Sequence, residues 1–116
     1  NQFPLYSVIK ELSDTTYTIG AAASLSCTLN YGANGIGPDS VKWKGMHSSL
    51  TKGTHYTIAE GVNEGGERTT TITFSNPNTI HYAQTYTCEF NYNTGSLKYE
   101  ETVELVVRRE FYSFMF

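Results

Sequence analysis

The chain has 116 residues, about the length of one domain, since roughly 150 residues per domain is the usual expectation. Its content of 39% hydrophobic, 14% aromatic and 16% charged residues is typical of a globular protein and excludes a disordered one. The net charge of -3 and the scattered basic side chains, with Arg108 and Arg109 the only adjacent pair, argue against a nucleic-acid partner.

The elements predicted along the chain are all strands. Weak strand patterns occur at residues 6–10, 15–19 and 55–59, and clear alternation of apolar and polar residues follows elsewhere. The alternation places these residues on buried faces, in chain order: Ala23, Leu25, Cys27, Leu29, Val41, Trp43, Ile72, Phe74, Tyr86, Cys88, Phe90, Val103, Leu105 and Val107. Turn-forming residues separate the strands, and no helical pattern appears. About seven to nine short strands therefore predict an antiparallel sandwich or a small barrel.

The two cysteines favour the sandwich. Cys27 and Cys88 lie 61 residues apart (88 minus 27) on the buried faces of two strands, so they can face each other across a sandwich core. A bridge there would stabilise the fold by about 3 to 5 kcal/mol in the chain-entropy model. Trp43, the only tryptophan, lies between them on a strand that would pass beside such a bridge. This is the Cys, Trp, Cys order of an immunoglobulin domain.

The chain from about Tyr6 to Val107 resembles the immunoglobulin superfamily. Tyr86, two residues before Cys88 in TYTCEF, resembles the tyrosine-corner residue of that family, whose hydroxyl bonds back to the preceding turn. The segments GAAASLSC, SVKWKGMHSSL, HYTI, TTTITF and TVELVV match other strands of the family. The resemblance implies an all-β, immunoglobulin-like antiparallel sandwich of two sheets. It also implies one inter-sheet disulfide, Cys27–Cys88, and a core that includes Leu25, Trp43, Ile72, Tyr86 and Leu105.

The subclass resembles the intermediate-type domains of adhesion molecules and receptors. The interval from Trp43 to Ile72 is 29 residues (72 minus 43), which is short for the two extra edge strands of a variable-type domain. One departure concerns the corner, where the family usually has Asp and Gly but this chain has Tyr82 and Gln84. Arg68 consequently has no assigned partner. We expect a single domain over residues 1–109, followed by an aromatic tail, residues 110–116, that is a linker to a next domain or an artificial extension.

Catalytic and metal sites are not expected. The three histidines, His47, His55 and His81, have no spacing that makes a ligand set. The acidic residues of segment 60–67 lack the order of a calcium loop, so we interpret this segment as a solvated turn. No pattern for a serine nucleophile or a phosphate loop occurs, and the cysteines are expected to be buried and paired. We therefore expect no enzyme and no cofactor.

Protein recognition remains, and in this fold it uses end loops or exposed sheet faces. Three groups of candidate binding residues follow from the sequence: Asn34 and Ile36 in the loop 30–40; Tyr92, Leu97 and Tyr99 in the turn 91–99; and Lys42, Lys44 and Glu89 on the outward face beside Thr87 and Asn91. Each group has a structural alternative. The loop is then a flexible connection with a locally buried Ile36, Tyr92 belongs to the core by strand parity, and the polar face is simply solvated.

The family resemblance implies an extracellular module of a cell-surface or secreted protein that binds another protein, either a different ligand or a second copy. Two cysteines, with none spare, suit an oxidising compartment. The absence of any Asn-x-Ser/Thr acceptor weighs against this view. The alternatives are an intracellular spacer domain of a muscle-type multidomain protein and a secreted immune recognition domain. No apolar run approaches the roughly 18 residues of a membrane helix, and the chain begins at Asn1, so we interpret it as a fragment or processed chain whose membrane attachment would come from other parts of the parent.

Overall fold

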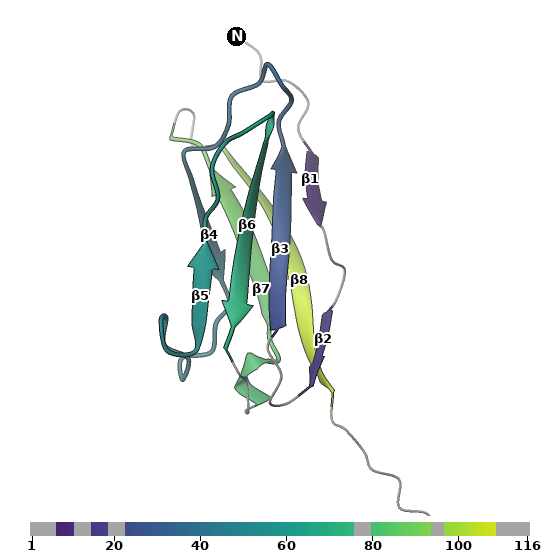
Figure 1. The fold of residues 1–116 in the computed structure, drawn as a ribbon, viewed down its shortest axis with the longest axis vertical. Coiled ribbons are helices and arrows are strands. Elements are labelled where there is room, and N and C mark those ends of the chain that lie inside the picture. Colours follow the sequence, from purple (N-terminus) through teal and green to yellow (C-terminus); the bar gives the residue numbers. More distant parts are fainter. Residues whose placement is uncertain (1–6, 11–14, 19–22, 76–79, 94–96, 109–116) are drawn as a thin grey trace, which may run out of the picture.

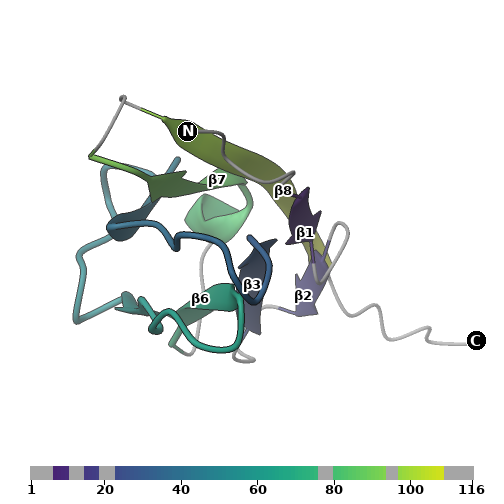
Figure 2. The ribbon, with the colours of Figure 1, turned by 90° about the horizontal axis from the view of Figure 1, so that it is seen from above.

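Two four-stranded sheets pack face to face in the computed structural model, which describes residues 7–10, 15–18, 23–75, 80–93 and 97–108 (Figures 1 and 2). The first sheet has the order β1 (Ser7–Lys10), β3 (Ala23–Asn30), β6 (Glu67–Phe74) and β5 (Tyr56–Ala59). The second has the order β2 (Thr15–Thr18), β8 (Lys98–Arg108), β7 (Thr85–Asn91) and β4 (Ser40–Lys44). All neighbours are antiparallel except β2 and β8, which are parallel. The predicted immunoglobulin-like sandwich is confirmed.

Each strand pattern found in the sequence corresponds to a strand of the structure. Viewed from above, β7 and β8 form one layer and β3 and β6 the other, with β1 and β2 along one side (Figure 2). The one helix of the described portion is a single 3-10 turn, η1 (Ile80–Tyr82), between β6 and β7. The aromatic tail at 110–116 lies outside the described residues.

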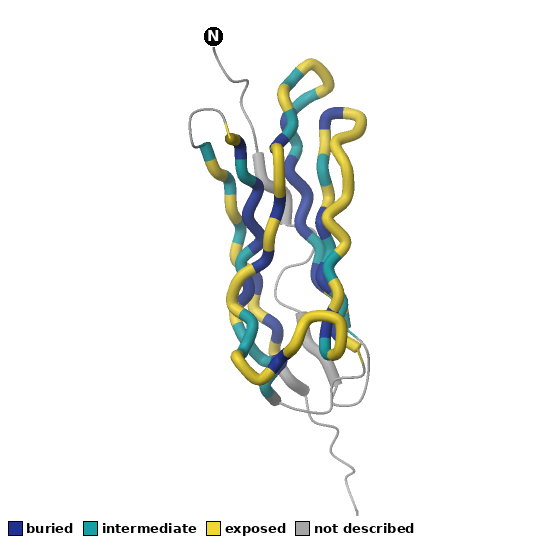
Figure 3. Tube along the Cα trace, turned by 90° about the vertical axis from the view of Figure 1, so that its left-hand side faces the viewer, coloured by how far each residue is buried: buried dark blue, intermediate teal, exposed yellow. Residues whose placement is uncertain are grey.

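The core lies between the two sheets and contains the residues that the alternation predicts from Leu25 to Leu105, with Ala23 partly buried against it, while the burial of Val107 lies outside what the structure describes. Leu25 and Ile72 are register partners on β3 and β6, and both are fully buried. Leu105 and Tyr86 bring the opposite sheet into the same cluster. Burial of each such side chain contributes about 1.5 to 3 kcal/mol. Buried positions therefore follow the strands in Figure 3, and exposed ones gather in the loops at the two ends.

Two kinds of contact join the sheets through the core. The disulfide Cys27–Cys88 links β3 to β7, as the family resemblance implied. Trp43, the register partner of Cys88, donates its indole N–H to Thr70 Oγ1 at 2.9 Å. The hydroxyl of Thr70 in turn donates to the carbonyl of Ala59 at 3.0 Å. Thr70 is fully buried, where an unpaired polar group would be costly. These two hydrogen bonds, which run from β4 through β6 to β5, pair both the Trp43 indole N–H and the Thr70 hydroxyl.

The tyrosine corner is present. Tyr86 donates its hydroxyl to the carbonyl of Tyr82 at 2.8 Å. Tyr82 occupies the place where the family usually has aspartate, and its own hydroxyl donates to the carbonyl of His55 at 3.0 Å. A buried tyrosine, exposed to only 1%, therefore replaces the carboxylate at this corner.

Arg68 finds backbone partners. Its guanidinium donates to the carbonyl of Pro38 at 3.0 Å and to those of Glu60 and Gly61 at 3.3 Å each. The arginine thus fastens the loop between β3 and β4 to the loop between β5 and β6, at the upper end of the sandwich in Figure 1.

Candidate protein-binding face

The outer face of the β4–β7–β8 sheet gathers three lysines around one glutamate. On β4, Val41 and Trp43 point into the core, so the alternating Lys42 and Lys44 point outward. On β7, Cys88 and Phe90 point into the core, so Glu89 between them also points outward. Glu89 pairs in register with Lys42 on one side and with Glu100 on the other. We call the set Lys42, Lys44, Glu89, Asn91 and Lys98 the lysine–glutamate face.

The three ammonium groups surround the Glu89 carboxylate. The Nζ atom of Lys44 lies 2.7 Å from Oε2 of Glu89, and the Nζ of Lys98 lies 3.6 Å from the same oxygen. Lys42 Nζ lies 3.7 Å from Oε1, to which the Asn91 amide also donates at 3.3 Å. The lysine side chains are about half exposed, whereas Glu89 is only 3% exposed. The aliphatic stems cover the carboxylate and leave the charged heads at the surface.

The charges of this face depend on one another. The hydrogen bond from Lys44 holds the pKa of Glu89 down, from the usual 4.5 to about 2, and Asn91 and Lys98 act in the same direction against the effect of burial. The same bond raises the pKa of Lys44. Glu89 is therefore ionised throughout the physiological range and holds the lysines in place.

The face carries a local positive charge on an acidic protein. The lysine–glutamate face and the adjoining Glu100, which lies 4.0 Å from Lys98, together have three lysines and two glutamates and a formal charge of +1 (3 minus 2), whereas the whole chain carries -3. Beside Lys44 on the neighbouring strands, Thr87 and Thr102 are register partners with hydroxyl oxygens 3.4 Å apart. The surface is thus polar, and its three lysine side chains are about half exposed.

Lys98 belongs to this face but was missed in the sequence. The alternation at Val103 extends backward through Glu101 and Tyr99 to Leu97, so Lys98, Glu100 and Thr102 face outward. The polar Glu101 at an inward position concealed this continuation. The signal was present, because Tyr99 and Leu97 keep the period of two.

The loop candidates lie elsewhere. Asn34 is exposed and Ile36 is 63% exposed, both in the loop between β3 and β4. Tyr92 is 4% exposed and donates its hydroxyl to the carbonyl of Ile36 at 2.7 Å, so it belongs to the core, as the parity alternative predicted. Leu97 and Tyr99 are partly buried and pack against the core. Of these candidates, only Asn34 and Ile36 are exposed. Tyr92 supports their loop from the core, and Leu97 and Tyr99 lie at the edge of the core.

Comparison with protein families gives a match over most of the chain. The immunoglobulin domain family matches residues 13–100, most of the chain. The chain belongs to the immunoglobulin domain family. A search of curated proteins gave no match.

Solved structures resemble this immunoglobulin domain. One is that of the titin immunoglobulin tandem domains A164-A165, with a TM-score of 0.61 and 25% identity. The alignment covers 89% of this chain and 47% of the titin structure, so the chain spans about half the length of that tandem. Immunoglobulin domains are generally non-catalytic and commonly bind other proteins.

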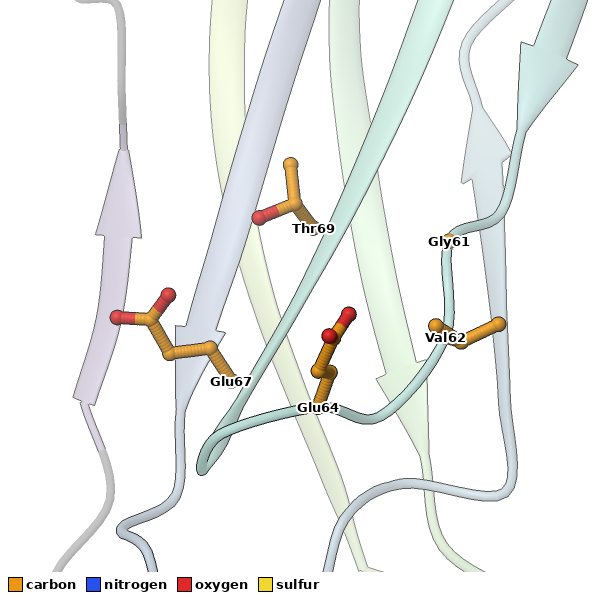
Figure 4. A pocket seen from close by; sticks show the side chains of 5 residues that line it. All are labelled: Gly61, Val62, Glu64, Glu67 and Thr69. Carbon is orange, nitrogen blue, oxygen red and sulfur yellow. The ribbon is translucent and has the colours of Figure 1, made fainter.

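The acidic segment 60–67, which connects β5 to β6 in this immunoglobulin domain, borders a surface hollow of about 480 Å³. Its lining comes from Gly61, Val62, Glu64, Glu67 and Thr69 (Figure 4). Backbone bonds between the residues at 64 and 67 close the turn, and their two carboxylates do not converge in the view of Figure 4.

Across the described residues, no group of three or more His, Cys, Asp or Glu side chains is placed to hold a metal ion. None of the helices in that part of the chain is long and apolar enough to cross a membrane.

Proposed function

We propose that this immunoglobulin domain, spanning residues 1–109, is a non-catalytic recognition module of an extracellular protein. It binds another protein through the lysine–glutamate face. The observation that carries the proposal is the burial of Glu89 beneath three lysines that remain about half exposed.

The physical support is preorganisation. A free lysine side chain loses rotamer entropy when a partner immobilises it, at a cost of about 0.5 to 1.5 kcal/mol. Here Lys44 and Lys98 are already drawn toward Glu89, so less freedom remains to be lost on binding. A positive patch of fixed geometry also favours fast, selective encounter with a complementary surface.

The extracellular placement rests on the thiols. Both cysteines of the chain are joined in the Cys27–Cys88 bridge, and such bridges persist in oxidising compartments. The proposed parent is a cell-surface receptor, an adhesion protein or a secreted protein, and the partner is either a different protein or a second copy of this domain.

A second candidate function is supported by the similarity to the titin tandem domains. In this alternative the domain is a structural spacer in an intracellular array. The two candidates differ in the state of the cysteines: intact mass of protein taken from its own compartment, with and without reductant, shows a difference of two hydrogens only if Cys27 and Cys88 are bridged there. Free thiols would support the spacer.

Binding is tested with the domain displayed as a tetramer on streptavidin and applied to living cells of the source tissue. The key variant is Lys42→Glu, because Lys42 is the most exposed lysine of the face and lies farthest from Glu89. Lys52→Glu is the matched control, since it makes the same charge change at an exposed lysine away from the face. Thermal denaturation confirms that both variants fold.

We expect Lys42→Glu to weaken binding about tenfold, which corresponds to 1.4 kcal/mol, and Lys52→Glu to leave it unchanged. Equal loss in both variants would indicate general charge attraction and would contradict a specific face. Sedimentation of the purified domain over a concentration series separates the two partner types, because self-association that Lys42→Glu abolishes identifies a second copy.

A further inference from the structure

The three histidines of the chain gather at one end of the domain. His47 lies in segment 45–55, which connects β4 to β5, His55 ends that segment, and His81 lies in η1. The rings of His47 and His81 stack, with centroids 4.1 Å apart and planes 23° from parallel. The ring of His55 contacts the edge of Tyr82, the residue after His81, with centroids 6.5 Å apart. This end is opposite the loop between β3 and β4 (Figure 1).

The rings of His47 and His55 also accept backbone hydrogen bonds. The Ser49 N–H donates to Nδ1 of His47 at 3.0 Å, and the Thr51 N–H donates to Nδ1 of His55 at 2.8 Å. An imidazole nitrogen accepts a hydrogen bond only while it carries no proton, so both contacts require the neutral ring. A protonated ring has N–H donors at both nitrogens and cannot make them.

The segment that these rings hold joins the two sheets, since β4 and β5 belong to different sheets. Leu50 anchors its middle in the core at 8% exposed. Lys52 is the one other charged or titratable residue of segment 45–55, and Tyr82 is the one titratable neighbour of His81 within η1. The strand β8 contacts η1 and carries Glu104 and Arg108 toward that end.

We propose that His47, His55 and His81 form an acid-sensitive clasp between segment 45–55 and η1. Histidine side chains change charge between pH 8 and pH 5. Proton uptake by His47 and His55 breaks the bonds from Ser49 and Thr51. Once His47 and His81 both carry a proton, like charges in contact repel and the stack opens, while Leu50 keeps the segment attached to the core. This device goes beyond the proposed binding function.

The test is NMR spectroscopy of the isotope-labelled domain between pH 7.5 and pH 5.0. Ring proton shifts report the protonation of each histidine, and an NOE between the rings of His47 and His81 reports the stack. We expect this NOE to weaken at pH 5.0, because the loss of one net hydrogen bond lowers the equilibrium constant for the stacked form about fivefold. The amide shifts of Ser49 and Thr51 should follow the ring titrations. An NOE that persists while both rings are protonated would overturn the proposal without any variant.

His47→Asn is the matched variant. An asparagine side-chain oxygen accepts a bond from the N–H two residues on, the same pattern that His47 makes to Ser49, but it does not titrate. In this variant the Ser49 amide should stop responding to pH while the Thr51 amide continues to do so. A Ser49 response equal to that of the natural protein would show that His47 is not its source. His81→Phe keeps a ring against His47 but removes the second charge, so the contact should persist at pH 5.0.

Discussion

Tyr86 donates its hydroxyl to the backbone carbonyl of Tyr82, 2.8 Å away, in a fully buried contact. Tyr82 extends the connection, because its own hydroxyl reaches the carbonyl of His55. Burial raises the pKa of Tyr82, so this hydroxyl remains a donor well above neutral pH. The two tyrosines together fasten β7, η1 and the start of β5 at one end of the sandwich.

Removing the Tyr86 hydroxyl should therefore destabilise the domain. Tyr86→Phe removes one of the two donors to the buried Tyr82 carbonyl, which keeps the bond from the Gln84 N–H at 2.9 Å. We therefore expect a loss of about 0.5 to 1.5 kcal/mol in the free energy of unfolding, measured by urea denaturation. Tyr82→Phe is the control, since its acceptor on the half-buried His55 can take water instead, and the loss should be smaller. A larger loss in Tyr82→Phe would place the main support of this corner at Tyr82.

The strands, the Cys27–Cys88 disulfide and the tyrosine corner could be predicted from the sequence, because each involves particular residue types at a fixed spacing. Alternation marks the inward face of each strand, and Tyr86 stands two residues before Cys88. The partners of Arg68 left no such mark. They are backbone carbonyls in two loops, and any residue supplies a carbonyl, so only the three-dimensional course of the loops could reveal them.

Arg68 provides the second prediction. A lysine has a single nitrogen and cannot reach the carbonyls of Pro38, Glu60 and Gly61 together. We expect Arg68→Lys to lower the free energy of unfolding by about 1 to 2 kcal/mol, and hydrogen exchange to rise in the two loops that Arg68 joins. Unchanged exchange there would show that these loops hold each other by other contacts.

Glu89 illustrates a second limit of the sequence. Its outward direction followed from strand parity, but its burial did not, because the cover comes from lysine stems on two neighbouring strands. The alternation along a strand shows on which face of the sheet a side chain lies. How exposed that side chain is depends on the side chains of the neighbouring strands, which the alternation does not show.

The third prediction concerns acid. Since the folded pKa of Glu89, about 2, lies below the usual 4.5, its ionised form stabilises the fold fully above pH 4.5, and this contribution disappears as the pH falls toward 2. Glu89→Gln should be less stable than the natural protein at pH 7, and the difference should shrink between pH 4.5 and pH 2. Denaturation at a series of pH values measures it. Glu100→Gln, at a half-exposed carboxylate, is the control and should change stability little at any pH.

The fourth prediction concerns the bridge. Cys27–Cys88 closes a separation of 61 residues, so its removal should cost about 4 kcal/mol in the chain-entropy model. The paired variant Cys27→Ala with Cys88→Ala tests this by denaturant unfolding, against the natural protein under oxidising conditions. A cost below about 1 kcal/mol would mean that the core around Trp43 holds the sheets together without the bridge.

The last prediction links the fold to the lysine–glutamate face. Gly45 directly follows Lys44, has φ of +107°, and a Cβ there would lie 2.4 Å from the carbonyl oxygen of Thr85. Gly53 has a similar φ of +93° but no atom within 4 Å of such a Cβ, so Gly53→Ala meets backbone strain alone. We expect losses of about 1 kcal/mol for Gly53→Ala and about 2 to 4 kcal/mol for Gly45→Ala, measured by thermal and urea unfolding.

The difference between these two variants isolates the clash with β7. Because relief of that clash displaces the end of β4, the amide resonances of Lys44 and Glu89 should shift in Gly45→Ala and stay in place in Gly53→Ala. Equal stability losses with unchanged resonances would mean that the β4 end adapts without moving Lys44. In that case the geometry of the face depends on the Glu89 carboxylate rather than on the turn that follows the strand.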